Sequence, residues 1–402
     1  STVESLTLIP RWKTSYLPAT ATMAKSATTR TGSTHGSRLP EEIFVWEILV
    51  RLPHRDLIRC RAVSHAWRRA ASARDLLLEH HRRQPPLPLI NRRGTPSACG
   101  RRWFNVAALD PHQQLQPVAR LDGSHVCVKA SCDGLLLLTE GLRGTPFGMR
   151  ASICNPATRQ IAHLPQLKGY VAVGLYRHRP TGEYRLLLRC GVFRPRRTMF
   201  VFELDRHQLP LMRVECLPDA SRYKLSPSAP VLLNGNLHWT WHPPALPHQT
   251  ETKNILVFDT MAESFHQIYS PLVHRADLFE MDGVLGMYSW DNGMTVVRIW
   301  AMEDYESHVW SFKYSVELPV PEVPPIEERR SLMVVYQEGC VRLLVACGGL
   351  LLCVDTQGKL LASSRDDGHS LSISKQFLKQ SLVSHTFFST LQDDTIPPWH
   401  FI

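Results

Sequence analysis

The chain has 402 residues, a formal net charge of +10 and 44% apolar residues. This length allows two or three domains of about 100–200 residues each, and the apolar content excludes a wholly disordered chain. No apolar run approaches the ~20 residues of a membrane-spanning helix, so we expect no membrane partner. The 10 cysteines form no C-x-x-C pair, which speaks against a zinc ribbon and favours a reducing compartment.

The first 37 residues are rich in Ser and Thr and contain one acid, Glu4, and four bases. This composition is found in disordered leaders and in organelle transit peptides. We expect residues 1–37 to be a disordered leader, with a transit peptide as the alternative.

The positive charge is concentrated in one segment. Residues 51–103 contain 13 Arg and three acids, which accounts for the whole formal net charge. Such a segment is either a solvated helical surface or a contact for nucleic acid or another acidic partner.

Residues 38–83 have the pattern of a small helical module. Pro40 suits the first turn of a helix, and an apolar stripe then runs from Phe44 to Leu52 before Pro53 ends the helix. A second helix is predicted over 55–62, and Ser64 is a candidate N-cap for a third. A segment of about 45 residues buries too little surface to be stable alone, which predicts a partner for its apolar side chains.

This segment resembles the F-box motif in its Leu-Pro, Ile-Leu, Arg-Leu-Pro, Cys-Arg-x-Val and Trp-Arg elements. The resemblance implies docking onto the Skp-type adaptor of a Skp–cullin–F-box ubiquitin ligase. It implies that six residues face the adaptor and that four pack between the helices of the module and its neighbours. The first group is Leu39, Pro40, Ile48, Leu49, Leu52 and Pro53, and the second is Leu57, Cys60, Val63 and Trp67.

Residues 84–103 are rich in Pro and Arg and are predicted to be a semi-rigid linker. The alternative is that part of this segment forms a first strand, because Leu87, Leu89 and Ile90 are apolar. From 104 to 390 the helical period disappears, and short apolar runs alternate with turn residues, which indicates an all-β domain. Residues 391–402 are assigned to a tail.

The β domain contains a loose internal repeat. Marker glycines at 134, 182, 235, 283 and 339 are spaced by 48, 53, 48 and 56 residues, close to the ~50 residues of a propeller blade. We expect these glycines to lie in tight hairpins that require a positive φ. Five units are visible, and a sixth could close from both ends of the domain.

This region resembles the F-box-associated, kelch-like domain of plant proteins. The elements that carry the resemblance are Ser131–Leu136, Cys154–Arg159, Asn234–Trp239, Ile255–Asp259 and Ile299–Met302. The expected fold class is therefore α+β multidomain, with a small three-helix F-box followed by an all-β kelch-like propeller. An open or irregular array of sheets is the alternative to a closed ring.

No nucleophile elbow, phosphate-binding loop, dinucleotide fingerprint or zinc-protease helix occurs in the chain. We therefore predict no catalytic residues, no metal and no cofactor. Trp239, Trp300 and Trp310 are expected in blade cores, whereas Trp241 and Trp290 lie beside loops and are candidates for contact with a target.

These observations favour a non-catalytic substrate receptor of a ubiquitin ligase, located in the cytoplasm, the nucleus or both. Its expected partners are the adaptor, the cullin ligase reached through it, and an unidentified target protein. The main alternative is a nucleic-acid or chromatin protein that uses residues 51–103. A propeller enzyme or sugar-binding module is a further class, which no convergent set of catalytic residues supports.

Overall fold

In the computed structural model of the chain, all of the described residues belong to one compact unit, Glu42–Ile402. The structure describes residues 43–94, 103–122, 126–141, 149–164, 170–190, 199–205, 211–214, 224–225, 229–242, 254–271, 276–291, 293–319 and 330–390. The expected leader, 1–37, and the expected tail, 391–402, lie outside these residues.

The described part of the N-terminal module is built from short helical segments. They are η1 (Phe44–Ile48), η2 (Leu49–Arg51), α2 (His54–Cys60), α3 (His65–Ala70) and α4 (Arg74–Arg83). The first expected helix is thus a π-helical turn followed by a 3-10 turn in its described part. The Oγ of Ser64 accepts a hydrogen bond from the backbone N–H of Trp67 at 3.2 Å, which confirms the predicted N-cap.

The rest of the unit is a propeller of six antiparallel sheets, which we number as blades I to VI. Blade I is β25 (His369–Leu378), β1 (Leu87–Gly94), β2 (Trp103–Leu109) and β3 (Leu115–Asp122), in that order from the centre. Blade II is β4 (Val126–Cys132), β5 (Leu135–Gly141), β6 (Met149–Asn155) and β7 (Gln160–His163). Blade III is β8 (Tyr170–Arg177), β9 (Tyr184–Cys190), β10 (Met199–Glu203) and β11 (Met212–Val214).

The second half of the propeller repeats the same order of strands. Blade IV is β13 (Val231–Leu233), β14 (Asn236–His242), β15 (Asn254–Asp259) and β16 (Ser264–Tyr269), with β12 (Lys224–Leu225) also paired to β14. Blade V is β17 (Ala276–Met281), β18 (Val284–Trp290), β19 (Val296–Asp304) and β20 (Val309–Glu317). Blade VI is β21 (Arg330–Gln337), β22 (Cys340–Cys347), β23 (Leu350–Val354) and β24 (Leu360–Arg365).

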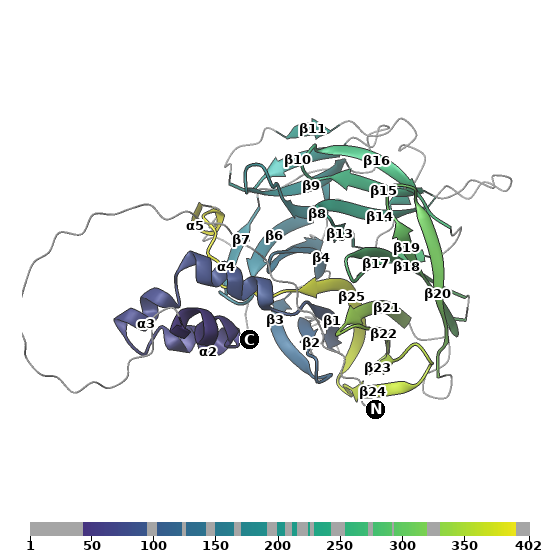
Figure 1. Cartoon of the computed structure of the whole chain (residues 1–402), viewed down its shortest axis with the longest axis horizontal. Coiled ribbons are helices and arrows are strands. Elements are labelled where there is room, and N and C mark those ends of the chain that lie inside the picture. Colours follow the sequence, from purple (N-terminus) through teal and green to yellow (C-terminus); the bar gives the residue numbers. More distant parts are fainter. Residues whose placement is uncertain are drawn as a thin grey trace, which may run out of the picture. The chain divides into compact units, whose positions relative to one another are not determined.

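Blade I joins the two ends of the propeller. Its innermost strand, β25, comes from the end of the domain and pairs antiparallel with β1 from Leu87↔Leu378 to Gly94↔His369. The innermost strands of the six blades gather around the centre of the ring (Figure 1). Blade I is therefore the unit that closes from both ends of the domain, as the sequence allowed, and the six sheets do not form an open array.

The ring is held by apolar contacts between neighbouring blades. Six clusters of buried side chains lie between blades I and II, II and III, III and IV, IV and V, V and VI, and VI and I. Strands whose two faces both pack against a neighbouring blade become apolar on both faces. This explains the continuous apolar runs of β5 and β22 in the sequence.

The marker glycines lie in the turns between the first and second strands of blades II to VI. Their φ angles are between +75° and +85°, as predicted. In four of the five turns the preceding residue also has a positive φ, namely Asp133, Asn234, Asp282 and Glu338. Two consecutive residues with positive φ define the tight hairpin that suits the twist of antiparallel strands.

The boundary between module and propeller differs from the main expectation. β1 occupies Leu87–Gly94 within the segment predicted to be a linker. Leu89 and Ile90 are fully buried in the two apolar clusters that flank blade I. Only 84–86 separate α4 from the propeller, so the alternative of a first strand is the one that the structure shows.

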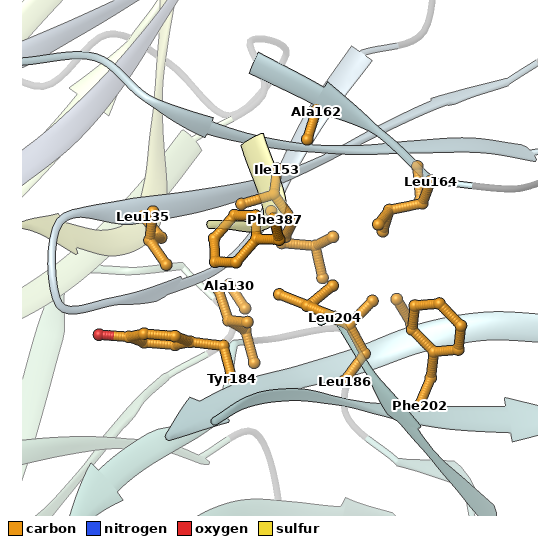
Figure 2. Close-up of a cluster of buried hydrophobic side chains, with 14 of the residues drawn as sticks. Ala130, Leu135, Ile153, Ala162, Leu164, Tyr184, Leu186, Phe202, Leu204 and Phe387 are labelled. Atoms are coloured by element: carbon orange, nitrogen blue, oxygen red, sulfur yellow. The ribbon is translucent and has the colours of Figure 1, made fainter. Parts of the chain in front are cut away.

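A segment that follows β25, residues 379–390, connects the module to the propeller, and we call it the strap. It ends in α5 (Phe387–Thr390). Phe387 is buried among side chains of blades II and III (Figure 2). Leu382 and Val383, earlier in the strap, are buried in the same apolar cluster as Leu49, Leu57 and Leu76 of the module.

A Cβ atom at Gly134 would lie 2.5 Å from Ser381 Cβ and 2.8 Å from the Lys379 carbonyl oxygen, whereas one at Gly283 would meet nothing within 4 Å. Both positions have a positive φ, so alanine at either costs about 1–3 kcal/mol in backbone strain. We expect Gly134→Ala to lose about 1–3 kcal/mol more, because the strap must move. Urea denaturation of the two variants measures the difference, and equal losses would show that the strap does not press on this hairpin.

Candidate functional site

The helical module has its own small apolar core, which also receives side chains from the propeller. Leu49, Val50, Leu57 and Leu76 have no exposed surface. Each such side chain stabilises the fold by about 1.5–3 kcal/mol relative to an exposed one. Because the module is too small to bury these side chains by itself, Leu382 and Val383 of the strap complete the core.

Two histidines of α4 stabilise this arrangement. His80 is fully buried, and its Nε2 lies 2.8 Å from the carbonyl oxygen of Leu52. Burial lowers the pKa of His80, so the ring is neutral near pH 7. The Nδ1 of His81 lies 2.9 Å from the carbonyl oxygen of Gln380. A carbonyl only accepts, so Nδ1 of His81 is the donor in this contact.

Polar contacts also hold the strap against blade II. The Nδ2 of Asn155 donates to the carbonyl oxygen of Ser381 at 3.0 Å, and the Oδ1 of Asn155 accepts from Ala157 N in the following turn.

The hydroxyl of Tyr184 donates to Asp133 Oδ2 at 3.0 Å. Burial acts to raise the pKa of Asp133, but hydrogen bonds from His81 and Tyr184 outweigh it and lower the pKa. This carboxylate is therefore charged at the point where module, strap and propeller meet.

The module nevertheless leaves large apolar side chains open. Six of them are between 38% and 63% exposed: Ile43, Trp46, Ile48, Ile58, Val63 and Leu78. A soluble domain places few such residues on so small a surface unless they are covered by a partner. Four of the six, Ile43, Trp46, Ile58 and Leu78, were not among the predicted site residues. The place of the first three in the apolar pattern of 43–58 was the signal that could have identified them.

The structure distributes the predicted adaptor residues between surface and core. Ile48 and Pro53 are exposed and Leu52 is half-buried, whereas Leu57 and Cys60 are buried and Trp67 packs on Phe44 with ring centroids 4.4 Å apart. Two placements differ from the expectation. Leu49 was expected to face the adaptor and is fully buried, because it packs in the same apolar cluster as Leu382 and Val383 of the strap. Val63 was expected to pack between the helices of the module and its neighbours and is 63% exposed.

Leu39 and Pro40 lie outside the described residues. No statement on their contacts follows from the structure, and they stay predictions.

The arginine-rich segment carries several internal ion pairs. Arg51 pairs with Glu47 at 2.5 Å and Arg59 with Asp56 at 2.9 Å. Glu79 accepts hydrogen bonds from Arg82 and Arg83, which lower its pKa to about 2. Arg92 lies in β1 and pairs with Asp366 at 2.6 Å. Part of the local positive charge therefore serves the fold rather than a ligand.

The topology of the blades assigns the two faces of the propeller to different roles. The turns between first and second strands lie on one face, together with the start of β1 and the end of β25, and we call this the module face. The connections between second and third strands, and from each blade to the next, begin and end at the opposite face, which we call the loop face. The long segments 243–253 and 320–329 lie outside the described residues.

Trp239 and Trp310 pack in apolar clusters between blades, as expected, whereas Trp290, which was expected at an open surface, packs against the cluster between blades V and VI. Trp239 is 3% exposed between blades III and IV. Trp300 is half-buried against Phe312, with ring centroids 5.5 Å apart, and Trp310 Nε1 donates to the carbonyl oxygen of Tyr269 at 2.9 Å. Trp290 is half-buried where β18 ends at the loop face. Nothing is described of the Trp241 side chain.

Trp290 has charged neighbours. Lys375 Nζ lies 5.6 Å from the centre of the Trp290 ring and 2.5 Å from Asp277 Oδ2. Asp277 is 4% exposed. Burial, and then the charge of Asp277, raises the pKa of Tyr288, which keeps that hydroxyl neutral. This cluster connects blade V to β25 of blade I.

The described residues contain no group of three or more His, Cys, Asp or Glu side chains placed to hold a metal ion. None of the described helices is long and apolar enough to cross a membrane. The described site consists of two surfaces suited to binding. One is formed by the exposed apolar side chains of the module, and the other by aromatic and charged side chains at the loop face.

The fold and this site together define a class of protein in which a short helical module is fixed to a six-bladed propeller. A profile of the F-box associated beta propeller domain matches residues 103–339, and a profile described as F-box-like matches residues 37–83. The chain belongs to the F-box associated beta propeller domain family.

Proteins from Arabidopsis thaliana are similar to this chain over about 70% of its length. An F-box/LRR-repeat protein is 24% identical over 322 residues, which cover 70% of this chain and 67% of the relative. An F-box protein is 24% identical over 333 residues, which cover 72% of this chain and 84% of the relative. Among solved structures, TolB from Acinetobacter baumannii aligns with a TM-score of 0.44 at 12% identity, over 78% of this chain and 72% of that chain.

His385 of the strap stacks on Phe387, with ring centroids 5.3 Å apart, and burial lowers the pKa of His385 to about 4. Between pH 6.5 and 4 the unfolded chain therefore takes up a proton that the folded chain does not, so stability falls as the pH falls. We expect His385→Phe to keep the ring contact and to flatten this dependence.

The measurement is the urea midpoint of wild type and variant at pH 7 and pH 5. His238, whose pKa is also lowered to about 4 by burial, keeps part of the slope in the variant. An unchanged slope in His385→Phe would show that His385 does not contribute.

Proposed function

We propose that this protein is a substrate-recognition subunit of a Skp–cullin–F-box ubiquitin ligase. The observation that supports it is the combination of an F-box-like module with six open apolar side chains and a closed propeller joined to it. In this proposal the module binds the Skp-type adaptor and, through it, the cullin ligase. The propeller binds a target protein, and the chain itself performs no chemistry.

Catalysis in such an assembly is a matter of position. A target lysine held near a ubiquitin-charged enzyme reacts in an effectively intramolecular step, which raises its effective concentration greatly. The buried contacts of Leu382 and Val383 support a fixed geometry between the module and the propeller. A fixed geometry would keep the target at a constant distance from the adaptor.

We assign the predicted adaptor residues two roles. Ile48, Leu52, Pro53 and Val63 have surface available for contact, together with Leu39 and Pro40 as predictions from the motif. Leu49, Leu57, Cys60 and Trp67 act from within, because they hold the helices on which the open residues stand.

For the target we propose the loop face, with Trp241 and Trp290 among the contact residues. The module and the strap adjoin the module face, which leaves the loop face as the larger free surface of a rigid scaffold. The classification of the blades as kelch-like, and a location in the cytoplasm, the nucleus or both, belong to the same proposal. The alternative of a nucleic-acid protein is less well supported, because four of the arginines in 51–103 pair with glutamates or aspartates of η1, α2 and α4.

The double variant Ile48→Asp, Val63→Asp tests the adaptor contact. Both side chains are exposed in this chain, at 39% and 63%, so the substitutions should leave the fold intact. Loss of two apolar contacts and the introduction of two buried charges should weaken adaptor binding at least about 100-fold.

The measurement is calorimetric titration of the full chain with a recombinant plant Skp-type adaptor. Leu361→Asp, at a 48% exposed apolar residue of blade VI, is the matched control and should bind like wild type. Full binding by the double variant would refute the docking proposal. Leu49→Asp is unsuitable, because a charge at this buried position would unfold the module.

Trp290→Ala tests the target contact. Proteins captured with the tagged full chain under proteasome inhibition are compared with those captured by the variant, using adaptor recovery as the internal reference. We expect at least one ubiquitylated protein to be lost while the adaptor is retained, because Trp290 lies at the loop face and away from the module. An identical set of captured proteins, from a variant of normal thermal stability, would remove Trp290 from the target surface.

A further inference from the structure

A groove lies between α2 of the module and the propeller, with a volume of about 980 Å³. His54, Arg55, Ile58 and Arg59 of α2, and Arg61 directly after it, line one side. The other side is formed by blade I around Pro117, by the turn 156–159 of blade II and by the start of the strap at Gln380. The groove is therefore a feature of the assembled chain, and neither the module nor the propeller contains it alone.

Positive charge surrounds this groove. Arg55, Arg59, Arg61 and Arg159 line it, and none of the described lining residues is an aspartate or a glutamate. The structure gives Arg55 and Arg159 no carboxylate partner among the described residues, and both are exposed. Arg59 pairs with Asp56 at the margin, and Arg61 Nε donates to the carbonyl oxygen of Ala71.

His54 lines the groove together with these arginines, and its pKa is lowered. Burial lowers the pKa of His54, and the charge of Arg55 lowers it further, followed by that of His80. A hydrogen bond from His54 to the Gln380 side chain and the charge of Asp56 raise the pKa, but they do not offset the lowering. The charges of the arginines that line the groove therefore favour an anionic group inside it.

The interior of the groove is apolar. Ile58, Val118, Ala157 and Leu382 are among its lining residues, and no Phe, Tyr or Trp side chain is. Binding of single-stranded nucleic acid depends on aromatic side chains on which bases stack. Arginines around an aliphatic floor suit a peptide in which acidic and apolar side chains alternate.

We propose that this groove receives an extended acidic segment of the adaptor that docks on the module. The inference rests on the proposed function and adds to it a contact in the propeller. The adaptor is the appropriate partner because α2 forms one wall of the groove and carries Ile58, which is 38% exposed. The target is expected on the loop face, which the groove does not reach.

A consequence is that a propeller residue influences adaptor affinity. Arg159 lies in the turn between β6 and β7, outside the F-box motif, and an adaptor that touched only the module would not respond to its charge. We expect Arg55→Glu and Arg159→Glu each to weaken adaptor binding by about three- to tenfold at ~0.05 M salt. At ~1 M salt the three affinities should converge, because screening then extends over only about 3 Å.

The experiment titrates the full chain with the recombinant plant adaptor at both salt concentrations. Arg298→Glu, at an exposed arginine of β19 in blade V, is the matched charge-reversal control and should bind like wild type. Thermal unfolding of each variant checks that the fold is retained, as expected for exposed positions.

If wild type binds the adaptor and Arg159→Glu binds equally well at low salt, the groove contact is refuted and the proposed function is not. If wild type does not bind the adaptor, the proposed function fails and the groove contact with it. A 20-nucleotide single-stranded DNA is titrated in parallel. DNA binding that both groove variants abolish would overturn the proposal in favour of a nucleic-acid site.

Discussion

The pairing of β25 with β1 is the constraint on which the rest of the structure depends. It joins strands separated by nearly 300 positions of the chain, and with it the last of the six apolar clusters between blades is formed. Without this pairing blade I would have an open edge, and open edges of sheets are sites of incorrect association. The same pairing fixes where the chain leaves β25 at Leu378, next to the start of β1 and hence next to the module.

The strap fixes the position of the module helices relative to the closed propeller, because it packs against both. Leu382 and Val383 complete the core of the module, and Phe387 and Phe388 are buried between blades II and III. Residues on both sides must be in place before either set of contacts forms. We therefore regard the module and the propeller as one folding unit rather than as two domains on a linker, in agreement with the single compact unit 42–402.

The apolar residues of the F-box motif serve two purposes that a sequence pattern does not separate. Leu49 and Leu57 belong to the core that the strap completes, whereas Ile48 and Val63 are open. Neighbouring positions in a short helix point in different directions, which lets Leu49 be buried while Ile48 beside it is exposed. The buried residues thus determine the shape of the surface on which the exposed residues bind a partner. The groove beside α2 extends that surface to the propeller.

The sequence by itself determined the repeat, the positive φ of the marker glycines, the cap at Ser64 and the presence of a helical module before an all-β domain, because these follow from local preferences and periodicity. Only the tertiary structure decided that 87–94 is a strand, that Leu49 is buried, and that Arg55 and Arg159 share a groove. Each of these depends on a contact between positions far apart in the chain, with β25, the strap or the turn of blade II. These contacts stabilise the fold only after the ring has closed and distant segments lie against each other. A local sequence pattern does not encode which distant segment a given residue will contact.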